Sequence, residues 1–139
     1  MNKKKIWIID DDIIYQKIIN RLIQKSGVFS THSSFMNGKE AITTLSKTLE
    51  NNEDCIPDII LLDINMPIMD GWEFMEEIKI IKSKINKQII IYIVSSSISL
   101  EDRNKSKTFT DISGYIPKPI SVEDLISIVE RNIDGKFLN

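Results

Sequence analysis

The stretch that decides the fold is Ile59-Ile60-Leu61-Leu62-Asp63, followed at once by Ile64-Asn65-Met66-Pro67-Ile68-Met69-Asp70-Gly71. Four consecutive apolar residues predict a short strand that is buried on both faces, as in a parallel sheet covered by helices. Asp63 then stands at the carboxyl end of that strand. Because open α/β sheets bind their ligands outside the carboxyl ends of their strands, Asp63 is a candidate functional residue.

Three more apolar runs end in polar side chains. Ile6–Ile9 precedes Asp10-Asp11-Asp12, Ile89–Val94 precedes Ser95, and Tyr115-Ile116-Pro117 precedes Lys118-Pro119. Each of these polar groups has an ordinary alternative when taken alone: a solvated turn for the aspartates, a loop cap for Asp63, a surface position for Lys118. In their order they form a set suited to one Mg²⁺ and one phosphoryl group.

Short runs rich in β-branched residues alternate with longer amphipathic stretches, which predicts βα units around a parallel sheet. The run Val28–Phe35 is more polar and is expected to be a strand near an edge. Helix starts are indicated by capping pairs, namely Asn37 with Glu40, Asp70 with Glu73, Ser99 with Asp102 and Ser121 with Asp124. The expected helices cover about residues 13–25, 38–49, 71–82, 100–109 and 122–133, with Gly27 ending the first and Gly135 the last.

Length and composition indicate one globular domain spanning residues 1–139, with its core at about 5–131. A chain of 139 residues can bury roughly two thirds of its unfolded surface, so no disulfide or metal is needed for folding. The net charge of −2 gives no basic footprint for nucleic acid. The single cysteine, Cys55, excludes an intrachain disulfide and suits a reducing compartment.

The sequence predicts a cytoplasmic protein without a membrane partner. Lys3-Lys4-Lys5 is followed by only four apolar residues before the aspartates, which does not match a signal peptide. The longest apolar run, Ile89–Val94, is far shorter than the roughly 20 residues of a membrane helix.

The ordered motifs closely resemble the receiver domain of two-component response regulators, of the stand-alone chemotaxis type. The resemblance extends from Lys5 to about Arg131, and its most specific part is Asp63–Gly71. It implies a flavodoxin-like (βα)5 fold, a three-layer sandwich around a five-stranded parallel sheet of order 2-1-3-4-5. Only about eight residues follow Arg131, so we expect no effector domain.

The resemblance implies a metal site for Mg²⁺. Asp11 and Asp63 would bind the ion directly, Asp10 through a water molecule, and Asn65 through its backbone carbonyl. The physical reason is independent of the family: three carboxylates in one crevice repel each other, and a divalent cation removes that repulsion.

The same resemblance assigns the phosphoryl chemistry. Asp63 would be the phospho-acceptor, Lys118 would supply a positive charge, and Ser95 a hydroxyl that binds a phosphoryl oxygen and acts in the switch. Tyr115 is the second switch residue, with a half-buried strand tyrosine as the alternative. Lys118-Pro119 is a candidate cis peptide bond.

The predicted function is Mg²⁺-dependent phosphoryl acceptance at Asp63 from a sensor histidine kinase or histidine phosphotransfer protein. The chain would be a phosphorelay switch that acts on an unknown output protein, and an enzyme only toward its own phosphorylation and dephosphorylation. A haloacid-dehalogenase-type phosphatase is a weaker alternative, because it requires an acid where Asn65 stands. A second alternative, an interaction module with a lost site, should lack Asp63, an upstream acid or Lys118.

The first predicted helix carries much apolar surface, which indicates either core packing or a docked partner. Tyr15 and Ile18 are candidate partner contacts, since the family docks its kinase there. Ser95 lies in the run Ser95-Ser96-Ser97, so its assignment depends on the strand register. Pro117 suits only an edge strand.

Overall fold

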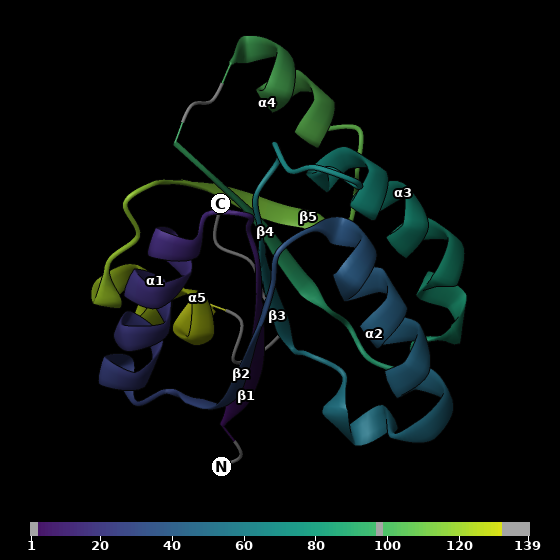
Figure 1. The fold of residues 1–139 in the computed structure, drawn as a ribbon, viewed down its shortest axis with the longest axis horizontal. Coiled ribbons are helices and arrows are strands. Elements are labelled where there is room, and N and C mark those ends of the chain that lie inside the picture. The colour runs from purple at the N-terminus through teal and green to yellow at the C-terminus, as the bar shows by residue number, and fades with distance from the viewer. Residues whose placement is uncertain (1–2, 97–98, 132–139) are drawn as a thin grey trace.

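The computed structural model describes residues 3–96 and 99–131, which form one five-stranded parallel sheet between two layers of helices (Figure 1). The strand order is β2-β1-β3-β4-β5. The strands are β1 (Lys4–Ile9), β2 (Phe29–Phe35), β3 (Ile59–Leu62), β4 (Ile90–Ser95) and β5 (Ile112–Pro117). This arrangement confirms the predicted (βα)5 flavodoxin-like fold.

The sheet places its most apolar strand at the centre. All four residues of β3 are buried, whereas β2 lies at one edge of the sheet and only its last residue, Phe35, is buried. β5 lies at the other edge, so Pro117 removes no hydrogen bond that a further strand would need. β5 begins at Ile112, three residues earlier than the apolar run Tyr115-Ile116-Pro117 indicates.

Five α-helices connect the strands: α1 (Ile13–Ser26), α2 (Gly38–Asn51), α3 (Gly71–Ile81), α4 (Leu100–Ser106) and α5 (Val122–Arg131). Short 3-10 turns, η1 (Glu53–Cys55) and η2 (Lys82–Lys84), follow α2 and α3. Asp70 and Glu73 form the predicted capping box, and Ser121 and Asp124 bond each other's backbone N–H in the same way. Gly27 ends α1 with a φ of 69°, a conformation that glycine adopts without strain.

One predicted helix end was wrong. The helix expected to reach Phe109 stops at Ser106, and the Phe109 N–H bonds the Ser106 carbonyl in a turn. Phe109 is buried in this turn and stacks on Trp72 of α3, with ring centroids 5.9 Å apart. We attribute the early end of α4 to the burial of the Phe109 ring, which the turn allows. The predicted end of the last helix near Ile133, and Gly135, lie outside the described residues.

Two hydrophobic cores lie on opposite faces of the sheet, and Figure 1 shows that different helices cover each face. α1 and α5 cover one face, where Ile19 and Leu125 pack on alternate residues of β1 and β3. α2 and α3 cover the other face. Both tryptophans, Trp7 and Trp72, belong to this second core. The alternation of side chains along each strand therefore divides one apolar run between two cores.

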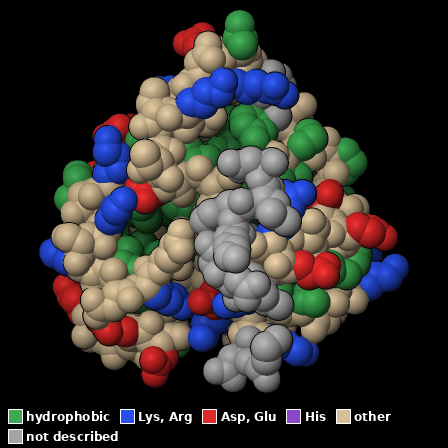
Figure 2. Space-filling model, turned by 180° about the vertical axis from the view of Figure 1, so that it is seen from behind, with side chains coloured by type: hydrophobic (Ala, Val, Ile, Leu, Met, Phe, Trp, Pro, Cys, Tyr) green, Lys and Arg blue, Asp and Glu red, His purple; other side chains and the backbone are tan. Residues whose placement is uncertain are grey.

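The surface shows no single dominant charge on the face seen in Figure 2, where acidic and basic side chains of the described residues are interspersed. Cys55 is exposed in η1. None of the helices in the described part of the chain is long and apolar enough to cross a membrane.

Candidate phosphoryl and metal site

The carboxyl end of β1 holds two of the candidate carboxylates. Asp10 is buried, and its backbone N–H donates to the carbonyl of Phe35 at the end of β2. The Asp12 N–H donates to Asp10 Oδ1 over 2.9 Å, and Asp12 Oδ1 accepts from the Tyr15 N–H over 3.1 Å. Asp12 is thus the N-cap of α1, while Asp11 is exposed at the rim.

Gln16 is a supporting residue that the sequence analysis missed. Its buried side-chain amide donates to the backbone carbonyls of Ile8, Asp10 and Phe35. It thereby ties the ends of β1 and β2 beneath the carboxylates. The available signal was its position three residues before Ile19, on the buried stripe of α1.

Asp63 directly follows β3 and lies beside the end of β1. Its N–H donates to the Ile9 carbonyl over 2.9 Å, and the residue is only 9% exposed. Gly71 packs behind it, since a Cβ at Gly71 would lie 2.5 Å from the Asp63 carbonyl oxygen. Any larger residue there would displace the backbone that holds Asp63, which explains the glycine at the start of α3.

The loop from Ile64 to Asp70 makes a tight turn at the rim of the site. The Met69 N–H donates to the Pro67 carbonyl over 2.7 Å, which forces Ile68 to a φ of 69°. That region is unfavourable for a β-branched residue, and the Ile68 side chain is 79% exposed. Asn65 is exposed in this loop, two residues after Asp63.

Lys118 enters the site from the end of β5. Its backbone N–H donates to the Ser95 carbonyl at the end of β4, and the Lys118-Pro119 bond is cis, as expected. Its ammonium Nζ lies 2.7 Å from Asp10 Oδ2 and 4.2 Å from the centroid of the Tyr15 ring. Two strand ends separated by 108 positions in the chain therefore meet through one ion pair.

Ser95 is buried at the last position of β4, opposite Pro117, while Ser96 is exposed. Ser97 lies outside the described residues. Tyr115 lies opposite Ile93, two positions back, so Tyr115 and Ser95 are diagonal neighbours on adjacent strands. The Tyr115 hydroxyl is buried and has no hydrogen-bond partner among the described residues; burial, and then Asp102, raises its pKa.

The carboxylates of Asp10, Asp11 and Asp63 each offer an oxygen within 4.8 Å of the others. Burial, and next the charge of Asp10, raises the pKa of Asp63 to about 6, although Lys118 opposes this shift. Three carboxylates face one ammonium, so the ionised cluster carries an excess negative charge in a partly buried crevice. A hard divalent cation with oxygen ligands fits this donor set.

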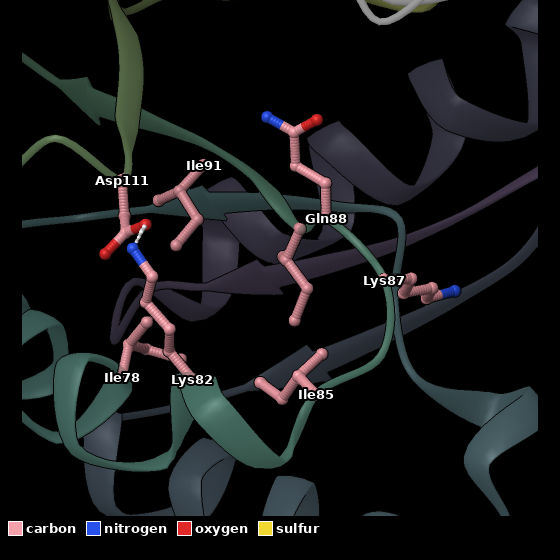
Figure 3. Close-up of a pocket in the computed structure, with 8 residues that line it drawn as sticks. Ile78, Lys82, Ile85, Lys87, Gln88, Ile91 and Asp111 are labelled. Carbon is pink, nitrogen blue, oxygen red and sulfur yellow. Dashed lines mark hydrogen bonds and ion pairs between the residues drawn. The ribbon is translucent and has the colours of Figure 1, made fainter.

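A cavity of about 270 Å³ lies away from this cluster, at the amino ends of β4 and β5 (Figure 3). Ile78, Ile85 and Ile91 line it, and the ion pair between Lys82 and Asp111, 2.9 Å long, lies beside them. None of the candidate residues lines this cavity. The candidate residues instead gather at the carboxyl ends of β1, β3, β4 and β5.

Comparison with known proteins identifies the class of this chain. A sequence model described as the response regulator receiver domain matches residues 6–130. The chain therefore belongs to the receiver-domain family of two-component signalling systems, which confirms the resemblance seen in the motifs. Receiver domains are signalling switches.

Relatives and solved structures agree with this assignment. The chain is 30% identical over 134 residues to the DNA-binding transcriptional regulator NtrC of Salmonella typhimurium, covering 96% of this chain and 25% of NtrC. It is 34% identical over 128 residues to the sensor histidine kinase CheAY of Helicobacter pylori, covering 92% of this chain and 15% of CheAY. The chain thus spans a quarter or less of these relatives.

Two solved structures show the same fold. A two component response regulator from Cytophaga hutchinsonii superposes with a TM-score of 0.86 at 24% identity, covering 97% of this chain and 100% of that one. The phosphorylated cyanobacterial phytochrome response regulator RcpA superposes with a TM-score of 0.69 at 31% identity, covering 94% and 93%.

Proposed function

We propose that this chain is a Mg²⁺-dependent phospho-acceptor switch, with Asp63 as the phosphorylated residue. The observation that carries the proposal is the position of Asp63. It is buried at the end of the central strand and clusters with two other carboxylates. The positive charge of Lys118 is close enough to oppose the rise in its pKa that burial causes. The alternative of an interaction module with a lost site has no support in this cluster, since each expected group is present.

The reaction is a phosphoryl transfer from a phosphohistidine of a sensor kinase or phosphotransfer protein. A carboxylate oxygen of Asp63 forms a bond to phosphorus while the bond from phosphorus to the imidazole nitrogen breaks, and that nitrogen keeps the electron pair. The product is an acyl phosphate. Such transfers depend mainly on position and charge neutralisation, not on covalent chemistry by further residues.

Each residue of the cluster has a separate part in this proposal. Asp10, Asp11, Asp63 and the backbone carbonyl of Asn65 would hold Mg²⁺, which supplies charge neutralisation for the phosphoryl oxygens when bound. Lys118 presents its ammonium to the same oxygens from the β5 side.

The test is phosphorylation by acetyl phosphate, which requires no partner protein. With Mg²⁺, intact-mass spectrometry should detect one added phosphoryl group that is lost in acid and in base. Asp63→Asn should remain unlabelled, and Glu76→Gln, an exposed acid on α3, should be labelled like wild type. Equal labelling of wild type and Asp63→Asn would exclude Asp63 as the acceptor.

The donor protein would dock on the outer face of α1. Ile13, Ile14 and Ile18 are 60%, 72% and 54% exposed, beside the crevice. Their exposure supports Ile18 as a contact, whereas Tyr15 is half-buried and faces Lys118. Ile14→Asp should slow transfer from any histidine phosphotransfer protein that labels wild type, with labelling by acetyl phosphate preserved. Slowing of both reactions would instead indicate a damaged site.

The output would come from a change in the face that contains α4 and β5. We propose that phosphorylated Asp63 attracts the Ser95 hydroxyl and that Tyr115 repacks in response. The diagonal arrangement of Ser95 and Tyr115 supports this coupling. Beryllofluoride, a phosphoryl mimic, should shift amide resonances between residues 100 and 120, and Ser95→Ala should lose the shifts. Identical shifts in both proteins would exclude this route.

A further inference from the structure

Four residues at the β1 end of the crevice form a closed ring of contacts. Asp10 Oδ1 accepts the Asp12 N–H over 2.9 Å, and Asp12 Oδ1 accepts the Tyr15 N–H over 3.1 Å. The Tyr15 ring then lies beneath Lys118 Nζ at 4.2 Å, and Nζ returns to Asp10 Oδ2 over 2.7 Å. The lysine side chain is therefore held by two different kinds of contact, an ion pair and an aromatic face.

The ring of Tyr15, and not its hydroxyl, makes the contact in this arrangement. The hydroxyl oxygen is buried and has no hydrogen-bond partner among the described residues. Burial, followed by the charges of Asp10 and Asp63, raises the pKa of this phenol, so the group stays neutral beside the carboxylates. An unpartnered buried hydroxyl is destabilising, so the hydroxyl does not account for the position of the ring.

We infer that Tyr15 is a positioning residue that holds the Lys118 ammonium over the crevice through its aromatic face. The inference rests on the proposed function, because it concerns the lysine that faces the phosphoryl group. Lys118 has a long, flexible side chain, and holding it in one conformation costs rotamer entropy. Its side chain is 17% exposed, which leaves a path toward solvent.

The aromatic contact matters most when Asp10 is engaged elsewhere. In the structure Asp10 is the only acid among the described residues that forms an ion pair with Lys118. If the carboxylate of Asp10 turns toward a cation, the ion pair weakens, whereas the Tyr15 side chain stays packed against the core and its backbone N–H stays bonded to Asp12. The ring then keeps the ammonium beside Asp63 during transfer. A cation over an aromatic face is attracted by the ring quadrupole, and the attraction increases when the pair is shielded from water.

The first test is a double-mutant cycle on the initial rate of labelling by acetyl phosphate. In this assay an Asp63 oxygen bonds to phosphorus and acetate leaves with the electron pair. Tyr15→Leu should lower the rate about threefold to tenfold, whereas Tyr15→Phe, which keeps the ring, should retain most of it. In a Lys118→Met background, Tyr15→Leu should change the rate less than about twofold. A purely structural role for Tyr15 would give the same factor in both backgrounds and would overturn the inference.

A second readout does not depend on activity. In metal-free protein, the ε-methylene protons of Lys118, assigned by their absence in Lys118→Met, should be shifted upfield by the ring current of Tyr15. Tyr15→Phe should keep the shift and Tyr15→Leu should lose it. An unshifted resonance in wild type overturns the inference, as does a large loss of rate in Tyr15→Phe, which would assign the role to the hydroxyl. Absence of labelling in wild type would instead overturn the proposed function itself.

Discussion

Replacing the proposed acceptor by its neutral isostere should stabilise the metal-free protein. Asp63 is buried beside Asp10 and Asp11, and its pKa is raised from 3.8 to about 6. The folded state therefore binds this proton more tightly than the unfolded state does. The contribution of the carboxyl is most favourable below pH 3.8 and is lost as the pH rises through about 6.

The size of the effect follows from the shift. Each pKa unit corresponds to about 1.4 kcal/mol, so the full shift is worth about 3 kcal/mol. Water still reaches part of the crevice and screens the charges, which reduces the expected gain to about 1–2 kcal/mol. We expect Asp63→Asn to raise the free energy of unfolding by this amount near neutral pH, and by little near pH 4, where the wild-type carboxyl is protonated in the folded state.

Urea denaturation in EDTA, at about pH 4 and about pH 7.5, measures this difference directly. Glu76→Gln is the matched control, because it removes one negative charge from an exposed position on α3 and should change the stability by less than about 0.5 kcal/mol. Destabilisation by Asp63→Asn at neutral pH, or a gain that is equal at both pH values, would refute the electrostatic account of the cluster.

Three further measurements test other parts of the structure. Mg²⁺ at 100 times its dissociation constant should stabilise wild type by about 2.7 kcal/mol in thermal melts, and Asp11→Asn should reduce this gain; an unmoved melting curve would mean that the metal site is misassigned. Asp58→Asn should lower the free energy of unfolding by about 1 kcal/mol in urea denaturation at neutral pH. Burial alone would raise the pKa of Asp58, but hydrogen bonds from Lys5 and Lys87 lower it below 3.8. The destabilisation should therefore shrink as the pH falls below 3.8. Ile68→Gly should be neutral or stabilising by up to about 1 kcal/mol, because glycine accepts the positive φ at Ile68 without strain; Ile68→Val is the control and should give no gain.

Local sequence patterns predicted most strands and helix starts, because these elements depend mainly on residues that are close together in the chain. The buried run Ile59–Leu62 fixed the central strand, and capping pairs such as Asp70 with Glu73 fixed helix starts to the residue. The end of α4 was predicted too late, because its boundary depends on the stacking of Phe109 against Trp72. That contact joins residues far apart in the chain, and helical periodicity contains no information about it.

In the candidate site, too, the sequence predicted some features and not others. Strand ends predicted that Asp10, Asp11 and Asp63 converge, because parallel strands bring their carboxyl ends to one edge. The contacts of Lys118 with Asp10 and with the Tyr15 ring could not be predicted, since they depend on the side-chain conformation of a long lysine. The sequence offered Tyr15 as a candidate partner contact with core packing as the stronger alternative, and in the structure it lies half-buried against the site.

Both tryptophans lie in the core beneath α2 and α3, so intrinsic fluorescence should report structural changes on that face of the sheet only. Trp7 and Trp72 are both almost fully shielded from solvent on this face, and Trp72 is stacked on the ring that follows α4. Emission intensity should thus respond when α4 moves relative to α3. Events confined to the opposite layer of helices, including docking of a protein on α1, should leave tryptophan emission almost unchanged. Tryptophan emission should therefore distinguish a movement of α4 from the binding of a partner on α1.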